Sequence, residues 1–310
     1  MNSLNFEAKG FELVKIRFFK FITSIITLGL LYPWGKMHEL RYLYSKTRYQ
    51  SVPFSFEGTQ RDYYKGFIKL WLSILLVLVL CTGGAFLVVY LIKSLFANII
   101  YTLTVLGCTI LALYITGITC NGTLNFRMNN TKWGTVALNY TGKPRELGSL
   151  FLVNGFLNML TLGLYTPWYI IKIFKYILNH FKFGNLTFEF SGDPKKLFVM
   201  YLKGYVFTIL TLGIYSIWFT KKVYEFFVSN ITIRKGEQEV KLVTDANTLQ
   251  VFEMIVGNFL IVLFTLGIGY SWAKVRLLRF IADHSIIPEG IIPESMENES
   301  PDQSFLNLIA

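Results

Sequence analysis

The sequence predicts a membrane protein of mixed α and β structure, with repeated helix–turn–helix units and β-hairpins in a cytoplasmic layer. Hydrophobic residues make up 53% of the 310 residues and charged residues only 16%, whereas a soluble domain usually has about 25% charged residues. Six long stretches contain no acidic or basic side chain, and one motif occurs four times. Together these features predict a multi-pass membrane protein.

The distribution of charge along the chain indicates which class of partner to expect. Residues 1–288 contain all 30 basic residues and 14 of the 19 acidic ones, so their net charge is +16. A basic, apolar and aromatic chain is typical of proteins that face anionic lipid, and we expect membrane lipids rather than nucleic acid as partners. A protein partner stays open. Cys81, Cys108 and Cys120 lie in apolar runs without metal-ligand spacing, so no metal and no cofactor is expected.

Short strand patterns precede the helical segments. Partial alternation of apolar and polar residues occurs at 4–7, 54–58, 136–140, 186–190 and 240–243. Turn residues accompany several of them, namely Asn129-Asn130, Gly184-Asn185 and Lys235-Gly236. Because open strands cannot lie in lipid, the predicted hairpins should form a small sheet layer outside the bilayer.

The charge-free stretches predict the membrane segments. They are 21–35, 70–92, 94–126, 147–171, 204–220 and 254–273. About 20 apolar residues cross the hydrocarbon core, so the second and third runs are predicted spans, the last three are candidate spans, and the first is short. Basic connections then place the 93–97 link outside. Either the shorter segments are helical hairpins that enter and leave on the cytoplasmic side, which we favour, or the positive-inside rule is broken repeatedly.

The repeated motif is Thr-Leu-Gly with tryptophan seven residues after the threonine. It predicts a helix that ends at Thr-Leu, a left-handed cap at glycine, and a second helix that places tryptophan near the headgroups. The turn residues are Gly29 with Trp34, Gly163 with Trp168, Gly213 with Trp218, and Gly267 with Trp272.

Each second helix carries a basic face. The fourth place after tryptophan holds His38, Lys172, Lys222 and Arg276, and the seventh holds Arg41, Lys175 and Arg279, with Glu225 as the exception. Places four and seven lie on one side of a helix. These seven basic and histidine residues are the candidate lipid-headgroup ligands, and the alternative is an ordinary solvated face.

Two segments carry a family resemblance. TLGLLYPWGKMHELRYLYSKTRYQSVPFSFEGT and NFLIVLFTLGIGYSWAKVRLLRF resemble the signature of the YjgN-like bacterial inner-membrane proteins, a family of unknown function. The resemblance covers roughly residues 4–284 and implies a multi-pass location in the inner membrane. In the third copy Ile217 replaces proline, which departs from the pattern.

The same patterns divide the chain. We expect a first unit at 1–66, a transmembrane hairpin at 67–122, further units at 123–192, 193–244 and 245–284, and an acidic flexible tail at 285–310. His180 and His284 fall at equivalent helix ends, where they can bond free carbonyls. Asn154, Asn158 and Asn258 predict hydrogen bonds between helices, and Glu253 a carboxylate at a helix start.

No catalytic motif is present in the sequence, so catalytic residues are not assigned and an enzyme is not expected. The predicted function is a non-enzymatic inner-membrane protein that binds anionic lipid or a membrane partner through its basic helix faces. The alternative is a transporter or channel built on internal repeats. The two predicted spans contain no acid, which weakens ion-coupled transport.

Overall fold

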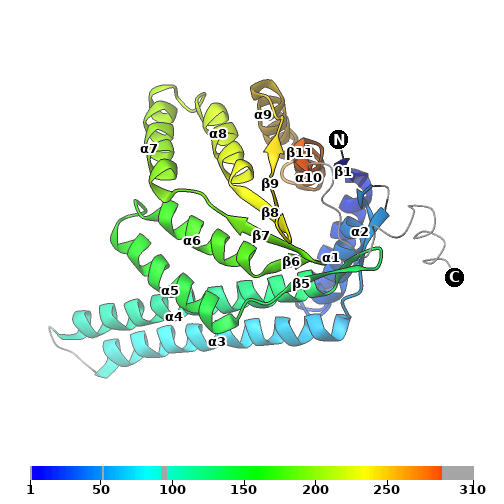
Figure 1. The fold of residues 1–310 in the computed structure, drawn as a ribbon. Coiled ribbons are helices and arrows are strands. Elements are labelled where there is room, and N and C mark those ends of the chain that lie inside the picture. The colour runs from blue at the N-terminus through cyan, green and yellow to red at the C-terminus, as the bar shows by residue number, and fades with distance from the viewer. Residues whose placement is uncertain (1, 51, 92–95, 288–310) are drawn as a thin grey trace.

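The computed structural model describes residues 2–50, 52–91 and 96–287, and Figure 1 shows a large sheet from which pairs of helices fan out. The helices are α1 (Gly10–Ile26), α2 (Tyr32–Ser45), α3 (Gln60–Leu91), α4 (Phe96–Asn129), α5 (Pro144–Leu160), α6 (Thr166–Asn179), α7 (Pro194–Leu210), α8 (Ser216–Ser229), α9 (Thr248–Phe264) and α10 (Tyr270–His284). The strands are β1 (Asn2–Phe6), β2 (Thr47–Tyr49), β3 (Val52–Phe56), β4 (Thr131–Trp133), β5 (Val136–Tyr140), β6 (Phe181–Phe183), β7 (Leu186–Phe190), β8 (Ile231–Lys235), β9 (Gln238–Lys241), β10 (Val243–Thr244) and β11 (Ser285–Ile287).

The chain runs strand, two helices, strand in succession, and this order places every helix pair on the same sheet. We call α3 and α4 the long pair, and α1–α2, α5–α6, α7–α8 and α9–α10 the short pairs; the turn between two paired helices is the tip. The combination of helices with a large antiparallel sheet confirms the α and β composition predicted above. The predicted unit boundaries remain a prediction, and those at 66 and 122 fall inside α3 and α4.

The sheet is larger than the small layer we expected. Its eleven strands are antiparallel, in the order β10-β11-β1-β2-β3-β4-β5-β6-β7-β8-β9. The first and last strands of this order, β10 and β9, are consecutive in the chain, with only Leu242 between them. Each of the five predicted strand patterns overlaps a strand, and those at 136–140 and 186–190 coincide with β5 and β7. Asn129-Asn130 is not a hairpin turn, since it ends α4; the turn between β4 and β5 contains Gly134, with φ +56°.

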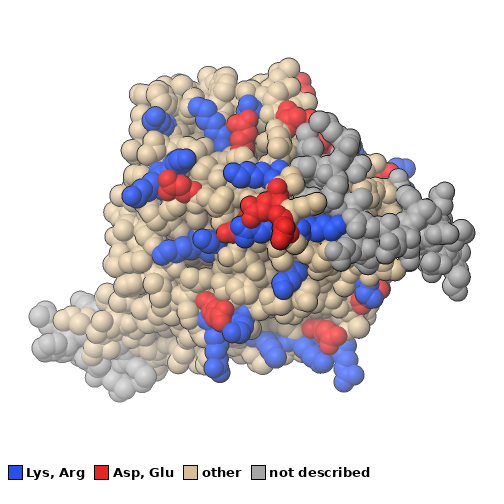
Figure 2. Space-filling view, in the orientation of Figure 1, with Lys and Arg blue, Asp and Glu red and all other residues tan. Residues whose placement is uncertain are grey.

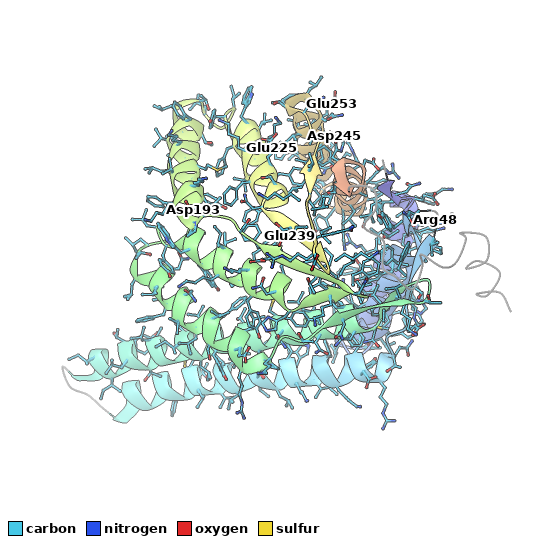
Figure 3. The ribbon with its side chains drawn as sticks, viewed as in Figure 1. Arg48, Asp193, Glu225, Glu239, Asp245 and Glu253 are labelled. Carbon is cyan, nitrogen blue, oxygen red and sulfur yellow. The ribbon has the colours of Figure 1, made fainter. Side chains whose placement is uncertain are left out.

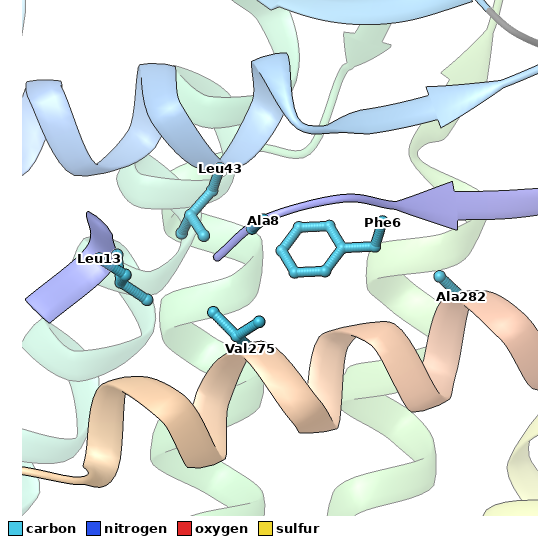
Figure 4. Packing of buried hydrophobic residues seen from close by; sticks show 6 residues of the cluster. All are labelled: Phe6, Ala8, Leu13, Leu43, Val275 and Ala282. Atoms are coloured by element: carbon cyan, nitrogen blue, oxygen red, sulfur yellow. The ribbon is translucent and has the colours of Figure 1, made fainter. Parts of the chain in front are cut away.

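The helices are arranged in chain order. Each helix contacts the next one, and α10 contacts α1, so the ten helices of the described residues form a closed ring. Phe6, Leu13, Leu43, Val275 and Ala282 are buried together at this closure (Figure 4). The two ends of the described chain also pair directly, because β1 lies between β11 and β2. Residues 285–287 of the predicted tail are therefore part of the sheet, and 288–310 lie outside the described residues.

The four Thr-Leu-Gly motifs form the tips of the four short pairs. Glycine has φ between 88° and 96° in each, and the preceding leucine also has positive φ, between 49° and 51°. The predicted left-handed glycine is present, but the leucine before it also adopts the left-handed conformation, which was not predicted. Threonine explains its own place in the motif, because its hydroxyl donates to the carbonyl four residues earlier and accepts the N–H four residues later.

Two helices in the described part of the chain are long and apolar enough to cross a membrane. They are Gln60–Gly84 of α3, with a mean hydropathy of 2.1, and Ile99–Asn129 of α4, with 2.0. None of the first window and only 6% of the second is buried, unlike the core helix of a soluble protein. These helices suggest association with a membrane. The 93–97 link that the sequence places outside lies largely beyond the described residues.

The other charge-free stretches are not straight helices. The runs at 147–171, 204–220 and 254–273, which we considered candidate spans, each fold back at a Thr-Leu-Gly tip. Each short-pair helix has at most 17 residues, about 25 Å at 1.5 Å per residue, less than the roughly 30 Å of a hydrocarbon core. Each helix of these three short pairs is therefore too short to be a straight transmembrane span.

Candidate functional site

A buried carboxylate surrounded by four cations lies where α1, α2 and α10 meet. Glu39 on α2 is only 1% exposed. Its Oε1 accepts hydrogen bonds from Arg17 at 2.9 Å and Lys274 at 3.1 Å, and its Oε2 from Lys20 at 2.7 Å and Lys36 at 3.1 Å. Arg17 also donates to the Ser271 hydroxyl at 3.2 Å. We call these four basic residues and Glu39 the Glu39 cluster; it has a net charge of +3.

The cations keep this buried carboxylate ionised. Burial by itself would raise the pKa of Glu39, but Lys36, Lys20 and Arg17 together hold it well below its usual range. The lysines experience the opposite balance, because burial lowers the pKa of Lys36 and of Lys274 in spite of the attraction of Glu39. The neighbouring cations thus favour the ionised form of Glu39, whereas burial disfavours the ionised forms of Lys36 and Lys274.

The sequence contains a signal for this site that the prediction of basic helix faces does not use. Lys36 and Lys274 stand at the same place, two residues after tryptophan, in the first and last copies of the motif, where the middle copies have Ile170 and Thr220. Glu39, five residues after its tryptophan, corresponds to isoleucine, valine and leucine in the other copies. Closure of the helix ring brings the first and last copies together.

Glycine makes room for one of the cations. A Cβ atom on Gly35 would lie 2.4 Å from Cγ of Lys20, so the absence of a side chain lets the Lys20 stem pass between α1 and α2 toward Glu39. The corresponding residue in the last copy is Ala273, which is buried. The local sequence around Trp34 is thus fitted to the Glu39 cluster.

The first basic face borders a groove of about 590 Å³ between α1 and α2. His38 and Arg41, both predicted headgroup ligands, line it together with Lys15, Phe19 and Trp34. The indole of Trp34 contacts the His38 imidazole edge-on, with centroids 4.5 Å apart. Phe19 and Trp34 lie on the tip side of the groove, and Lys15 and Arg41 lie nearer the sheet, so the groove is apolar at one end and basic at the other.

The other predicted ligands do not converge on one site. Lys172 donates to Asn154 at 2.9 Å and to the Tyr165 hydroxyl at 2.8 Å, and Lys222 lies 3.5 Å from the corresponding Tyr215. Arg276 bonds the Glu253 carbonyl at 3.4 Å. Lys175 is exposed on α6. These side chains thus belong to separate helix pairs.

Two of the predicted ligands have a structural contact that the sequence did not indicate. Arg279 donates to the carbonyls of Phe6 and Ala8, and Arg41 donates to that of Gly58. Arg279 thus connects the α9–α10 pair to the segment that precedes α1, and Arg41 connects the α1–α2 pair to the segment that precedes α3. Part of the basic face therefore stabilises the ring, whatever else it binds.

The histidines at helix ends occupy the role predicted for them. The Nδ1 atoms of His180 and His284 lie 2.8 Å and 2.9 Å from the carbonyls of Tyr176 and Phe280. Asn158 and Asn258 make the predicted bonds between paired helices, to Thr166 and to the Ala273 carbonyl. The expectation for Glu253 is wrong, because it lies in the second turn of α9 and the Asn247–Gln250 capping box closes that helix start.

Tryptophan packs between helix pairs at two of the four tips. The Trp168 ring lies 5.1 Å from Phe198 of α7, and the Trp272 ring lies against Gly10 of α1. Trp218 is 44% exposed. The predicted position near the headgroups is thus compatible with Trp218, whereas Trp168 and Trp272 have neighbours of their own.

Acidic side chains are spread over the molecule. Asp193, Glu225, Glu239, Asp245 and Glu253 come from separate elements and do not point into a common site (Figure 3). Asp193 caps α7, and Glu225 pairs with Lys221 at 2.9 Å. Within residues 2–50, 52–91 and 96–287, no group of three or more His, Cys, Asp or Glu side chains could hold a metal ion.

Comparison with known protein families gives a match. Residues 1–207 match the family described as "Bacterial protein of unknown function (DUF898)", which corresponds to the YjgN-like proteins. Searches of curated proteins and of solved structures found no match. The matched residues include Glu39 but not α10, which supplies Lys274. The match is shorter than the predicted extent of 4–284 and includes the first of the two resembling segments but not the second, at 258–280. Because it covers two thirds of the chain, the protein belongs to the DUF898 family of bacterial proteins.

Proposed function

We propose that this protein is a non-enzymatic protein of the bacterial inner membrane that binds anionic lipid through its basic helix faces. The sheet lies on the cytoplasmic side, the long pair crosses the bilayer, and the four short pairs enter only the near leaflet. The observation that carries this proposal is the arrangement of apolar tips directly above basic residues on every short pair.

The tips are the most exposed apolar parts of the molecule. Leu28, Leu162, Leu212 and Leu266 are 93–95% exposed, and large apolar residues such as Ile26, Leu210 and Phe264 beside them are more than 70% exposed. Leucine in the left-handed region is strained, and full exposure to water would add to that cost. Insertion of the tips into lipid removes the second cost, since exposed apolar patches mark contact surfaces.

Basic residues mark the depth of insertion. The first charged residue after each tip is Lys36, Lys172, Lys221 or Lys274, which lies in the fifth to seventh position of its helix. At 1.5 Å per residue this is roughly 6–9 Å from the helix start, similar to the roughly 5–10 Å to which interfacial helices sink. The ammonium groups would then lie at the level of the lipid phosphates.

The groove between α1 and α2 has the polarity that a lipid requires. Its Phe19 and Trp34 end faces the apolar tip, and its Lys15 and Arg41 end faces the sheet. An acyl chain would lie along the aromatic end, with the anionic headgroup between the two cations. Figure 2 adds that the projecting part of the long pair, at lower left, shows no charged side chains among its coloured atoms.

Substitution of the basic faces tests the proposal. Lys172, Lys175, Arg276 and Arg279 would be changed to Gln in one variant, and Lys15 and Arg41 in another. Each basic residue near a charged membrane surface contributes about 1 kcal/mol, so the fourfold variant should retain far less anionic lipid in native mass spectrometry. The difference should shrink as salt is raised, because exposed charges are screened.

The matched control removes basic charge from the sheet. Lys182 on β6 and Lys241 on β9 are exposed, and their double Gln variant should retain anionic lipid as the wild type does. A Lys172→Gln, Lys175→Gln variant provides the comparison at equal charge. Equal retention of anionic lipid by all variants, with folding intact, would show that the basic faces only orient the protein.

A further inference from the structure

The Glu39 cluster has more positive charge than its one carboxylate can balance. Arg17, Lys20, Lys36 and Lys274 all reach Glu39, and their side chains are only 15–26% exposed. In the part of the chain that the structure describes, Glu39 is the only acid within 4.0 Å of these four groups. Partly buried cations without counter-ions are costly, so the excess charge of three favours an anion from outside.

The cluster also has hydrogen-bond donors to spare. Each of the three lysines donates once to Glu39, although an ammonium group has three N–H donors. The Glu39 oxygens already accept from several donors each, so they offer little more. Between 15% and 26% of each side chain remains accessible, which leaves the remaining donors within reach of a small ligand.

We propose that the Glu39 cluster is a binding site for a phosphate group. Inorganic phosphate or a terminal phosphate monoester has a charge near −2 and three strong acceptor oxygens, which suits an excess of three positive charges with free ammonium donors. Glu39 acts as the internal counter-ion that holds the four cations in place. A phosphate could come from a lipid headgroup, since the lysines lie just below the apolar tips, or from free phosphate in the cytoplasm.

The site is distinct from the proposed lipid-binding faces. Lys36 and Lys274 stand two places after tryptophan, whereas the basic faces stand four and seven places after it, on another side of the helix. Because Lys36 and Lys274 come from the first and last copies of the motif, the complete cluster forms only at the closure of the ring.

Binding of inorganic phosphate to the full-length protein in neutral detergent is the first test. By calorimetry, the Lys36→Gln, Lys274→Gln variant should bind phosphate at least tenfold more weakly than wild type. The Lys172→Gln, Lys175→Gln variant removes the same charge from a basic face and should bind as wild type does. If the double variant fails to fold, Lys36→Gln alone, which leaves three cations on Glu39, should still weaken binding.

A second arm distinguishes the source of the phosphate. Wild type and both double variants would be mixed with phosphatidylcholine nanodiscs containing phosphatidic acid. A loss of phosphatidic acid retention in the Lys36→Gln, Lys274→Gln variant that exceeds the loss in the Lys172→Gln, Lys175→Gln variant supports a lipid headgroup, and loss confined to the detergent arm supports free phosphate. Wild type that binds neither ligand, or variants that bind both equally well, would overturn the site without deciding the function of the basic faces.

Discussion

At the scale of single residues, Glu39 should contribute more to stability than the acidic residues of exposed ion pairs do. Surface ion pairs such as Lys132–Glu57, at 2.7 Å and about half exposed, typically contribute between 0 and about 1 kcal/mol. Removing one partner of a buried pair typically costs about 3–5 kcal/mol. Glu39 is the common partner of four cations from three helices, so its loss would leave repelling charges at the closure of the ring.

We therefore expect Glu39→Gln to lower the thermal stability of the protein far more than Glu57→Gln. The pH dependence should follow from the lowered pKa of Glu39. A carboxylate whose pKa is lowered by folding stabilises the protein above its unfolded pKa, about 4.3, and loses this contribution as pH falls.

Melting temperatures measured between pH 7 and pH 3 would check this prediction. The difference between wild type and Glu39→Gln should be constant above about pH 5 and should narrow below pH 4.3. A difference that widened on acidification would mean that Glu39 is not held ionised by its neighbours.

At the scale of elements, the tip turn gives the clearest link between sequence and structure. Thr, Leu and Gly each have a defined part: a hydroxyl that caps both helices, an apolar side chain presented outward, and a backbone at φ near +90°. L-residues rarely adopt the last conformation, whereas glycine does so easily. The same turn therefore appears wherever the three residues do.

Gly213→Ala should destabilise the protein, by roughly 1–2 kcal/mol, since alanine resists the left-handed region. The control is Gly66→Ala in α3, where nothing lies within 4 Å of the added Cβ and φ is helical. That substitution should be neutral or stabilising, because alanine is the better helix former. Melting temperatures of the two variants would be compared, and equal losses would contradict the assignment of strain to the tip.

The elements were largely predictable, and the site was not. Strand alternation located β5 and β7 at their observed bounds, and the Thr-Leu-Gly motif located every short-pair tip. The prediction of 147–171 as a candidate span rested on its length, and the length of an apolar run does not show whether the run folds back on itself. The Glu39 cluster depends on contacts between Arg17, Glu39 and Lys274, which lie more than 200 residues apart at the extremes, and periodicity within one helix contains no information on such contacts.

At the scale of the whole molecule, the sheet constrains how the protein can lie in a membrane. All described strands belong to one hydrogen-bonded order, and no sheet can be divided by the hydrocarbon core without leaving backbone groups unpaired. If the helix pairs enter a membrane, every connection from a pair to the sheet must therefore lie on the same side of it. The continuity of the sheet, more than the number of basic residues in each connection, favours hairpins that enter and leave on one side over alternating spans.

Cysteine labelling in intact cells should reveal that common side. In a background without Cys81, Cys108 and Cys120, single cysteines would replace Arg48, Lys182 and Gln238, which are exposed on β2, β6 and β9. An impermeant maleimide should label all three only after the membrane is permeabilised, because the basic sheet side is expected to face the cytoplasm. Leu212→Cys at the α7–α8 tip should resist the impermeant reagent in both conditions and react with a lipid-soluble one. Labelling of the three sheet positions from different sides would be incompatible with one continuous sheet, whereas labelling of Leu212→Cys by the impermeant reagent would mean that the tip lies in water and not in the leaflet.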